Sequence, residues 1–153
     1  MKRLEQCQLI LTKQLDSIFF IDCKSQAFHH LQTVSNLATL LAYKRSLDPC
    51  LLAVAGLFHD LSFYLTHVSD QHAKKSAELT KTLLAKEKIF TEKELMIIIQ
   101  SINLHSNKDT YDDAYAEALK DADVLAKIID EPNFIPDLTQ QERYLRLKKQ
   151  IGA

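Results

Sequence analysis

The sequence predicts an all-α protein, and three observations support this fold class. The chain of 153 residues contains two glycines and three prolines, whereas sheet-rich folds need such turn residues often. Apolar residues recur every three or four positions, which is the spacing of a helix that buries one face. Helix start signals also occur at several places. We therefore expect one compact domain, residues 1–153, with about six to seven helices and no sheet.

The first three helices are expected at 3–20, 25–45 and 49–64. The first has charged residues between its apolar ones, a pattern typical of an amphipathic helix and not of a signal peptide. The second carries an apolar stripe along one face. The third is preceded by Asp48, a preferred N-cap residue, and starts with Pro49, which suits the first helical position.

The next two helices are expected at 70–87 and 92–105. The pattern Thr91-x-x-Glu94 before the second of them is that of a capping box. In such a box the two side chains satisfy backbone N–H groups that the first turn leaves without partners.

The last part of the chain contains two more predicted helices, at 112–129 and 139–150. The segment between them, 130–137 with the sequence DEPNFIPD, is expected to be the main loop. A second capping-box pattern, Thr139-x-x-Glu142, favours a start of the final helix near Thr139.

Composition excludes several classes of protein. The formal net charge is -1, with 46% hydrophobic and 25% charged residues, so neither a nucleic acid nor an anionic membrane is predicted as an obligate partner. No apolar run approaches the roughly 20 residues of a membrane span. The three cysteines, Cys7, Cys23 and Cys50, are widely spaced and odd in number, which indicates reduced thiols and a cytoplasmic protein.

The six histidines of the chain do not fall on the same kind of helix face. His30, His72 and His105 share stripes with apolar residues, and His59 ends an apolar stripe before the adjacent Asp60. We therefore expect four histidines on separate helices, and Asp60 with them, to point inward. The remaining two are expected at the surface: His29 and His67.

The inward histidines and Asp60 together predict a metal site. Each buried imidazole otherwise needs its own hydrogen-bond partner. Asp60 lies inside the apolar segment 51–65, where a bare carboxylate is costly. A shared divalent cation satisfies all of these groups at once, and imidazole with carboxylate suits Zn, Mn, Fe, Ni or Co.

These residues resemble the HD-domain superfamily of metal-dependent phosphohydrolases. His30 opens HLQTVSNLATLLA, which is similar to the family's first His element. The adjacent pair His59 and Asp60, with its apolar lead-in, resembles the element that gives the family its name. KDADVLAKI, at 120–128, looks like the family's A-D-x-L element, and this resemblance assigns the last ligand to Asp123.

Periodicity alone does not choose between Asp121 and Asp123, because both have apolar neighbours. The resemblance extends over about 26–128. It implies an all-α HD core over this range, on which the helices 3–20 and 139–150 would pack.

Two further stretches resemble the additional ligands of two-metal relatives. They are HAKKSAELTKTLL, beginning at His72, and INLHSNKD, around His105. By this resemblance a first ion has the ligands His30, His59, Asp60 and Asp123. A second ion would be held by His72 and His105, with Asp60 as the bridge. One or two divalent ions are therefore expected, with Fe or Mn preferred and Zn, Ni, Co and Mg left open.

The resemblance implies hydrolysis of a phosphoester or phosphoanhydride through a metal-bound hydroxide. The substrate would be a small phosphorylated molecule, with a nucleotide preferred. Asp60 and His59 are the expected catalytic pair, Asp60 acting as a bridging ligand and not as a general base. The predicted phosphate-binding residues are Lys74, Lys75 and Lys108.

Two aromatic residues after the His-Asp pair, Phe63 and Tyr64, are candidates for the wall of a base-binding pocket. Phe63 is also a departure, since many relatives carry Lys or Glu at that position. The ligand set leaves two alternatives open: a di-iron oxygenase of the HD type, and a non-catalytic binding module that a metal stabilises. The oligomeric state stays open too, with a homodimer as one option.

Overall fold

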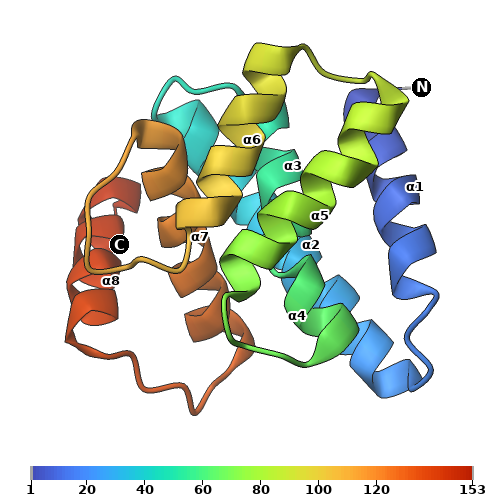
Figure 1. The fold of residues 1–153 in the computed structure, drawn as a ribbon. Coiled ribbons are helices and arrows are strands. Elements are labelled where there is room, and N and C mark those ends of the chain that lie inside the picture. The colour runs from blue at the N-terminus through green and yellow to red at the C-terminus, as the bar shows by residue number, and fades with distance from the viewer. Residues whose placement is uncertain (1, 153) are drawn as a thin grey trace.

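The computed structural model describes residues 2–152. This range contains eight α-helices and no strand. The all-α prediction is therefore confirmed (Figure 1). The helices are α1 (Arg3–Leu15), α2 (Ile21–Lys44), α3 (Pro49–Phe58), α4 (Leu61–Thr66), α5 (His72–Glu87), α6 (Glu92–Leu104), α7 (Ala114–Asp130) and α8 (Leu138–Ile151).

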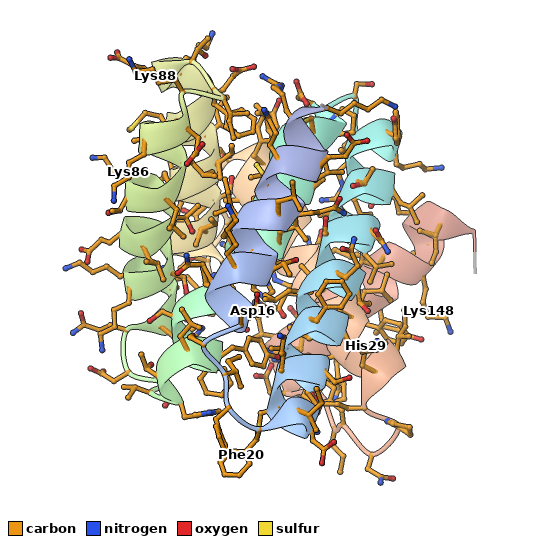
Figure 2. All side chains as sticks on the ribbon, turned by 90° about the vertical axis from the view of Figure 1, so that its right-hand side faces the viewer. Asp16, Phe20, His29, Lys86, Lys88 and Lys148 are labelled. Carbon is orange, nitrogen blue, oxygen red and sulfur yellow. The ribbon has the colours of Figure 1, made fainter. Side chains whose placement is uncertain are left out.

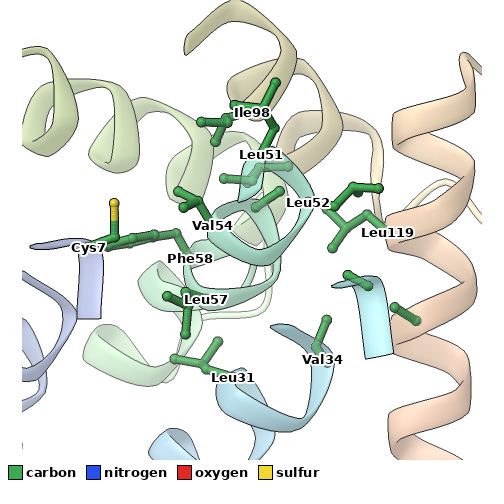
Figure 3. Packing of buried hydrophobic residues seen from close by; sticks show 14 of the residues in the cluster. Cys7, Leu31, Val34, Leu51, Leu52, Val54, Leu57, Phe58, Ile98 and Leu119 are labelled. Carbon is green, nitrogen blue, oxygen red and sulfur yellow. The ribbon is translucent and has the colours of Figure 1, made fainter. Parts of the chain in front are cut away.

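The centre of the molecule is α3, which contacts α1, α2, α5, α6 and α7. Every residue from Leu51 to Phe58 is buried. Figure 3 shows Leu52, Leu57 and Phe58 among the side chains of the surrounding helices. An apolar helix that is buried on all sides is typical of a core element, so α3 provides the rigid base on which the following residues are held.

The predicted helix 49–64 is interrupted at its most polar point. α3 ends at Phe58 and α4 begins at Leu61, and Asp60 between them has φ -113° and ψ 15°, outside the helical range. In a continuous helix of 3.6 residues per turn, neighbouring side chains project about 100° apart. The interruption is what allows His59 and Asp60 to point toward the same place, and it raises the number of helices above the expected six to seven.

A glycine lets α2 and α3 approach closely. A Cβ atom added at Gly56 would lie 2.6 Å from the Cα of Ser35 and 2.7 Å from its nitrogen. The neighbouring atoms belong to the backbone of α2 and cannot rotate away. The hydroxyl of Ser35 also donates to the carbonyl of Ala53 at 2.8 Å. This crossing positions α2, and therefore His30, against the end of α3.

The predicted starts of two helices are confirmed. The side chain of Asp48 accepts hydrogen bonds from the backbone of α3, with Pro49 in the first turn. Thr91 and Glu94 form the capping box of α6. The first helix ends earlier than expected, at Leu15.

The expected cap of the last helix is wrong. α8 begins at Leu138, its N-cap is Asp137, and the reciprocal partner is Gln140. Asp137 and Gln140 have the same three-residue spacing as Thr139 and Glu142 and make the same two hydrogen bonds. Short sequence signals of this kind overlap, so the pattern alone does not select the register.

The terminal helices lie on opposite sides of the molecule (Figure 1). α1 packs against α2 and α3, and α8 packs against α7. The stretch Pro49–Thr66 is long and apolar enough for a membrane span, but 67% of it is buried inside the fold. It is the core of this helical domain, because its apolar surface is already covered by other helices.

Candidate metal centre

Four predicted ligands from separate parts of the chain meet beside the end of α3. One nitrogen or oxygen atom from each of His30, His59, Asp60 and Asp123 lies within 4.8 Å of the others. His30 comes from α2 and Asp123 from α7, while His59 and Asp60 form the junction between α3 and α4. The Oδ1 atom of Asp123 is 3.4 Å from His30 Nε2 and 3.5 Å from His59 Nε2.

These separations suit a common ion. Ligand atoms about 2.1 Å from one ion, in tetrahedral or octahedral geometry, lie roughly 3.0–3.5 Å from each other. Asp60 Oδ2 is 3.3 Å from His59 Nε2 and 3.9 Å from His30 Nε2. The four residues are buried, so the donors are held in place by the surrounding core.

Asp60 also faces a second group of histidines. Its other oxygen, Oδ1, lies 3.1 Å from His105 Nε2 and 3.4 Å from His72 Nε2. Asp60, His72 and His105 form a second set of atoms within 4.8 Å of one another. Each oxygen of this one carboxylate therefore faces a different group, which is the arrangement that a bridging ligand requires.

The backbone orients three of the imidazoles. In each of them Nδ1 lies at hydrogen-bond distance from a carbonyl oxygen three residues earlier, which makes Nδ1 a donor and aims Nε2 away from that carbonyl. The three pairs are His59 with Gly56 at 2.8 Å, His72 with Ser69 at 2.9 Å, and His105 with Ile102 at 2.7 Å. All three Nε2 atoms face the carboxylate of Asp60.

The structure separates the two aspartates that periodicity left open. Asp123, 1% exposed, lies among the histidines. Asp121 is also buried, but its oxygens pair with Arg45 at 2.6 Å and Arg143 at 3.1 Å. Both arginines are distant in sequence, so only the tertiary structure shows that Asp121 is already neutralised.

Buried polar atoms without partners gather at this cluster. Among the described residues, such side-chain atoms are His30 Nε2, His59 Nε2, Asp123 Oδ1 and Asp130 Oδ2. Buried polar groups in folded proteins are nearly always hydrogen-bonded. Three of the four atoms face one point between His30, His59 and Asp123, so the residues present fit a bound cation.

The charges of the cluster are strongly coupled. Burial alone would lower the pKa of His59, but the carboxylates of Asp60 and Asp123 raise it to about 10. Burial alone would raise the pKa of Asp60, and yet His59 and His105 hold it well below its usual value. Without a metal ion a proton on His59 therefore supplies the positive charge, and an incoming cation must displace that proton.

Two lysines approach Asp123 from its other side. Lys108 Nζ lies 2.7 Å and Lys127 Nζ 3.5 Å from Asp123 Oδ2. Lys108 is also bonded to the carbonyl of His105 at 2.6 Å, and burial lowers its pKa although Asp123 opposes this. Both its position and its partners assign Lys108 to holding Asp123 in place.

Lys127 was missed by the sequence reasoning. It lines a cavity of about 280 Å³ beside the cluster, together with His30, Asp60, Phe63, Tyr64, Ser69, His72 and Glu131. The spacing of four residues between Asp123 and Lys127 could have predicted this position, because residues one helical turn apart lie on the same face of α7. The carboxylate of Asp123 raises the pKa of Lys127, so this ammonium stays charged at neutral pH.

The structure does not bring Lys74 and Lys75 to this cavity. Lys74 lines a separate hollow between α5 and α6 with Lys81 and Met96. Lys75 donates to the carbonyl of Asp70 at 2.8 Å. Both follow His72 closely in sequence, but successive residues of α5 project from different sides of the helix.

The two histidines expected at the surface are there. The side chain of His29 is 67% exposed and contacts Asp130 Oδ1 at 3.0 Å. Figure 2 labels it on α2. His67 is exposed and ends α4 with φ 55°. Neither belongs to the two groups around Asp60.

Comparison with known proteins identifies the family. A family model described as HD domain matches residues 27–128, about two thirds of the chain. No curated protein and no solved structure shows a significant match. HD domains bind divalent metals and are generally hydrolases, and the matched range contains all six residues around Asp60. The chain belongs to the HD domain family.

Proposed function

We propose that this protein is a metal-dependent phosphohydrolase that cleaves a phosphoester or phosphoanhydride of a small metabolite, with nucleotides among its substrates. The observation that carries this proposal is the position of Asp60. One of its oxygens faces His30 and His59, and the other faces His72 and His105. A carboxylate shared between two groups of imidazoles is what a two-metal hydrolytic site needs.

The six residues divide into two sets of ligands. A first ion, Fe or Mn preferred, would have the ligands His30, His59, Asp60 and Asp123. A second ion would have His72, His105 and the other oxygen of Asp60. When bound, such ions activate water as a nucleophile near neutral pH and neutralise charge on phosphate oxygens.

The protein itself would bind and orient the substrate. Tyr64 and Lys127 line the cavity beside the cluster, and Lys127 would hold a phosphate oxygen by charge and hydrogen bonding. Phe63 and Tyr64 form one wall, with their rings 5.4 Å apart. A substrate that enters here meets His30, Asp60 and His72 at the inner end.

The reaction would be an in-line displacement at phosphorus. The water oxygen forms the new P–O bond, the ester P–O bond breaks, and the proton that water gives up balances the one that the leaving oxygen takes. Asp60 and His59 act here as positioned ligands. Neither is assigned the role of a general base, because the free Nε2 and carboxylate oxygens point toward the ions' positions.

The cellular context is part of the proposal. The three cysteines are unpaired, which favours a reducing compartment such as the cytoplasm. A small phosphorylated molecule is the proposed partner, with neither a nucleic acid nor a membrane required.

The test begins with purification without chelator and elemental analysis, followed by a panel of nucleotides and simple phosphoesters. We expect metal-dependent release of phosphate that stops with chelator and returns with metal. His67→Asn is a matched control, since it replaces an exposed histidine and Asn tolerates the positive φ of that position. Full metal content without phosphatase turnover would contradict the proposal, and dioxygen consumption by an iron-loaded sample would favour the oxygenase.

A further inference from the structure

The cavity beside the metal ligands does not end at His30. A second cavity of about 420 Å³ adjoins it and is lined by Gln26, His29, His30, Phe63, Tyr64, Asp130 and Glu131. The two cavities share His30, Phe63, Tyr64 and Glu131. They are therefore two parts of one cleft, with the aromatic pair along its length.

The two parts of the cleft differ in charge. The lining of the inner cavity contains the ammonium of Lys127 and the carboxylates of Asp60 and Glu131, of which Asp60 is a proposed metal ligand. The lining of the outer cavity includes the carboxylates of Asp130 and Glu131 but neither a lysine nor an arginine. The outer lining also includes two histidines: His29, which is exposed and already contacts Asp130, and His30, a proposed metal ligand. Lys127 and the proposed ions therefore favour an anionic group at the inner part, whereas Asp130 disfavours one at the outer part.

The order of these charges follows from α7. Asp123 and Lys127 lie one turn apart on α7, and Glu131, four residues further, is the C-cap that follows its last turn. With a rise of 1.5 Å per residue, Lys127 and Glu131 are about 6 Å apart along the axis. A substrate lying along α7 thus meets a metal ligand, a cation and a carboxylate in sequence.

One unpartnered atom shows that hydrogen-bonding capacity is available in this region. Asp130 Oδ2 is buried without a partner, 3.9 Å from His30 Nδ1. Unsatisfied buried acceptors of this kind favour a ligand that carries donors.

We propose that the cleft selects phosphoesters whose organic group carries a cationic or hydrogen-bond-donating nitrogen. The phosphate lies at Lys127 and the histidines, and the nitrogen lies at Asp130 and Glu131. This inference rests on the proposed phosphohydrolase function and specifies its substrate class. Two sources of such a nitrogen share the required chemistry: a short aminoalkyl chain and the amino-bearing edge of a nucleobase.

Matched pairs of ligands test this selection. Phosphoethanolamine and propyl phosphate have nearly the same shape and differ in a terminal ammonium. Guanosine and inosine monophosphates differ in one exocyclic amine. Calorimetric titration of the metal-loaded protein should give at least about tenfold tighter binding for the nitrogen-bearing member of one pair, equivalent to about 1.4 kcal/mol. The pair that shows the preference identifies the source of the nitrogen.

Variants connect the preference to the outer carboxylates. Glu131→Gln should reduce the ratio of dissociation constants within the preferred pair, and Glu131→Lys should reverse it toward the ester without a nitrogen. Glu142→Gln is the matched control, because Glu142 is an exposed glutamate on α8 and lines neither cavity. The ratio of dissociation constants within the preferred pair should be the same for Glu142→Gln as for the wild type.

Binding and turnover are measured separately so that the two proposals fail separately. Equal binding of both members of both pairs, with Glu131→Lys unchanged, would overturn the proposed selection. A clear binding preference without any phosphate release would instead contradict the phosphohydrolase function and leave the selection standing.

Discussion

Two clusters of charged side chains include residues of α7, and they differ in how completely their charges are paired. The metal cluster consists of Asp60, the five other proposed ligands that surround it, Lys108 and Lys127. The Arg143 cluster consists of Arg45, Asp112, Glu117, Lys120, Asp121 and Arg143, which contribute three positive and three negative charges. All of the unpartnered buried side-chain atoms in residues 2–152 lie in or beside the metal cluster, and none lies in the Arg143 cluster.

The Arg143 cluster is complete without a ligand. Arg143, 1% exposed, donates to Glu117 at 2.7 Å and to the carbonyls of Lys108 at 2.9 Å and Thr110 at 3.1 Å. Lys120 donates to the same Thr110 carbonyl at 2.9 Å. A cluster whose members satisfy one another contributes to structure, whereas one with unsatisfied atoms is built to receive something else.

The two clusters are also connected. The backbone of Lys108 accepts from Arg143, and the ammonium of Lys108 holds Asp123. α8 lies outside the range 27–128 that matches the family model. A helix beyond the matched range therefore helps to hold the loop that follows His105.

The largest expected loss of unfolding free energy comes from a substitution in the Arg143 cluster. Arg143→Ala leaves Glu117 and Asp121 each with one cation fewer in a buried setting, which costs about 3 kcal/mol or more of the free energy of unfolding. Denaturant unfolding with chelator present measures this, and Arg143→Lys provides a milder variant if the alanine protein does not fold. Arg146→Ala, an exposed arginine on the same helix that stacks on Tyr111, should cost less than about 1 kcal/mol. If Arg143→Ala and Arg146→Ala lowered the free energy of unfolding equally, the Arg143 cluster would not have the structural role described above.

A metal-dependent effect is expected for Asp60→Ala. In the wild type, free metal at 100 times its dissociation constant adds about 2.7 kcal/mol to the free energy of unfolding. The variant lacks the carboxylate that both groups of histidines share, so this increment should disappear. Unfolding with and without metal, together with elemental analysis, measures it, and Asp109→Ala, an exposed aspartate, serves as control. A variant that keeps its full metal content would show that Asp60 does not bridge.

The pH dependence should distinguish the clusters when metal is absent. His59 has its pKa raised to about 10, so its contribution to stability is complete below about pH 6.5, the value of an unfolded histidine, and is lost as the pH rises toward 10. Asp60 and Asp123 have lowered pKa values, so their contribution is lost as the pH falls below about 4. Glu117, in the Arg143 cluster, has its pKa lowered to about 2 and adds no loss on the alkaline side.

Melting temperatures with chelator at pH 5, 7 and 9 test this expectation. The metal-free protein should become less stable as the pH rises from 7 to 9, because His59 then loses its proton, whereas the lowered pKa of His105 acts in the opposite direction between pH 5 and 7. Metal affinity should increase over the same range, because the cation competes with the proton on His59. A metal-free stability that does not change between pH 6.5 and 9 would contradict the proton on His59.

The smallest effect on stability is expected for His72, a proposed ligand of the second ion. His72→Ala and His105→Ala should each lower the metal content from about two ions per chain toward one and reduce phosphatase turnover. His72 is partly exposed, with 27% of its side chain accessible, so its loss should change the free energy of unfolding little. One ion in the metal-saturated wild type, with both variants fully active, would contradict the two-metal arrangement.

The sequence alone determined the fold class and indicated which histidines point inward. Low glycine and proline content, apolar periodicity and the caps at Asp48 and Thr91 predicted helices, because these signals act within a few residues of one another. The inward faces of His30 and His105 followed from the same local periodicity. These features belong to single helices, so they can be read without knowledge of how the helices pack.

Only the tertiary structure decided how those residues are used. It separated Asp123 from Asp121 by placing Arg45 and Arg143 beside the latter, and it put Lys127, not Lys74 or Lys75, in the cavity. It also interrupted the predicted helix 49–64 so that His59 and Asp60 converge. Each of these outcomes depends on atoms that are distant in sequence and close in space, and the periodicity of one helix contains no information about which charge another helix brings to it.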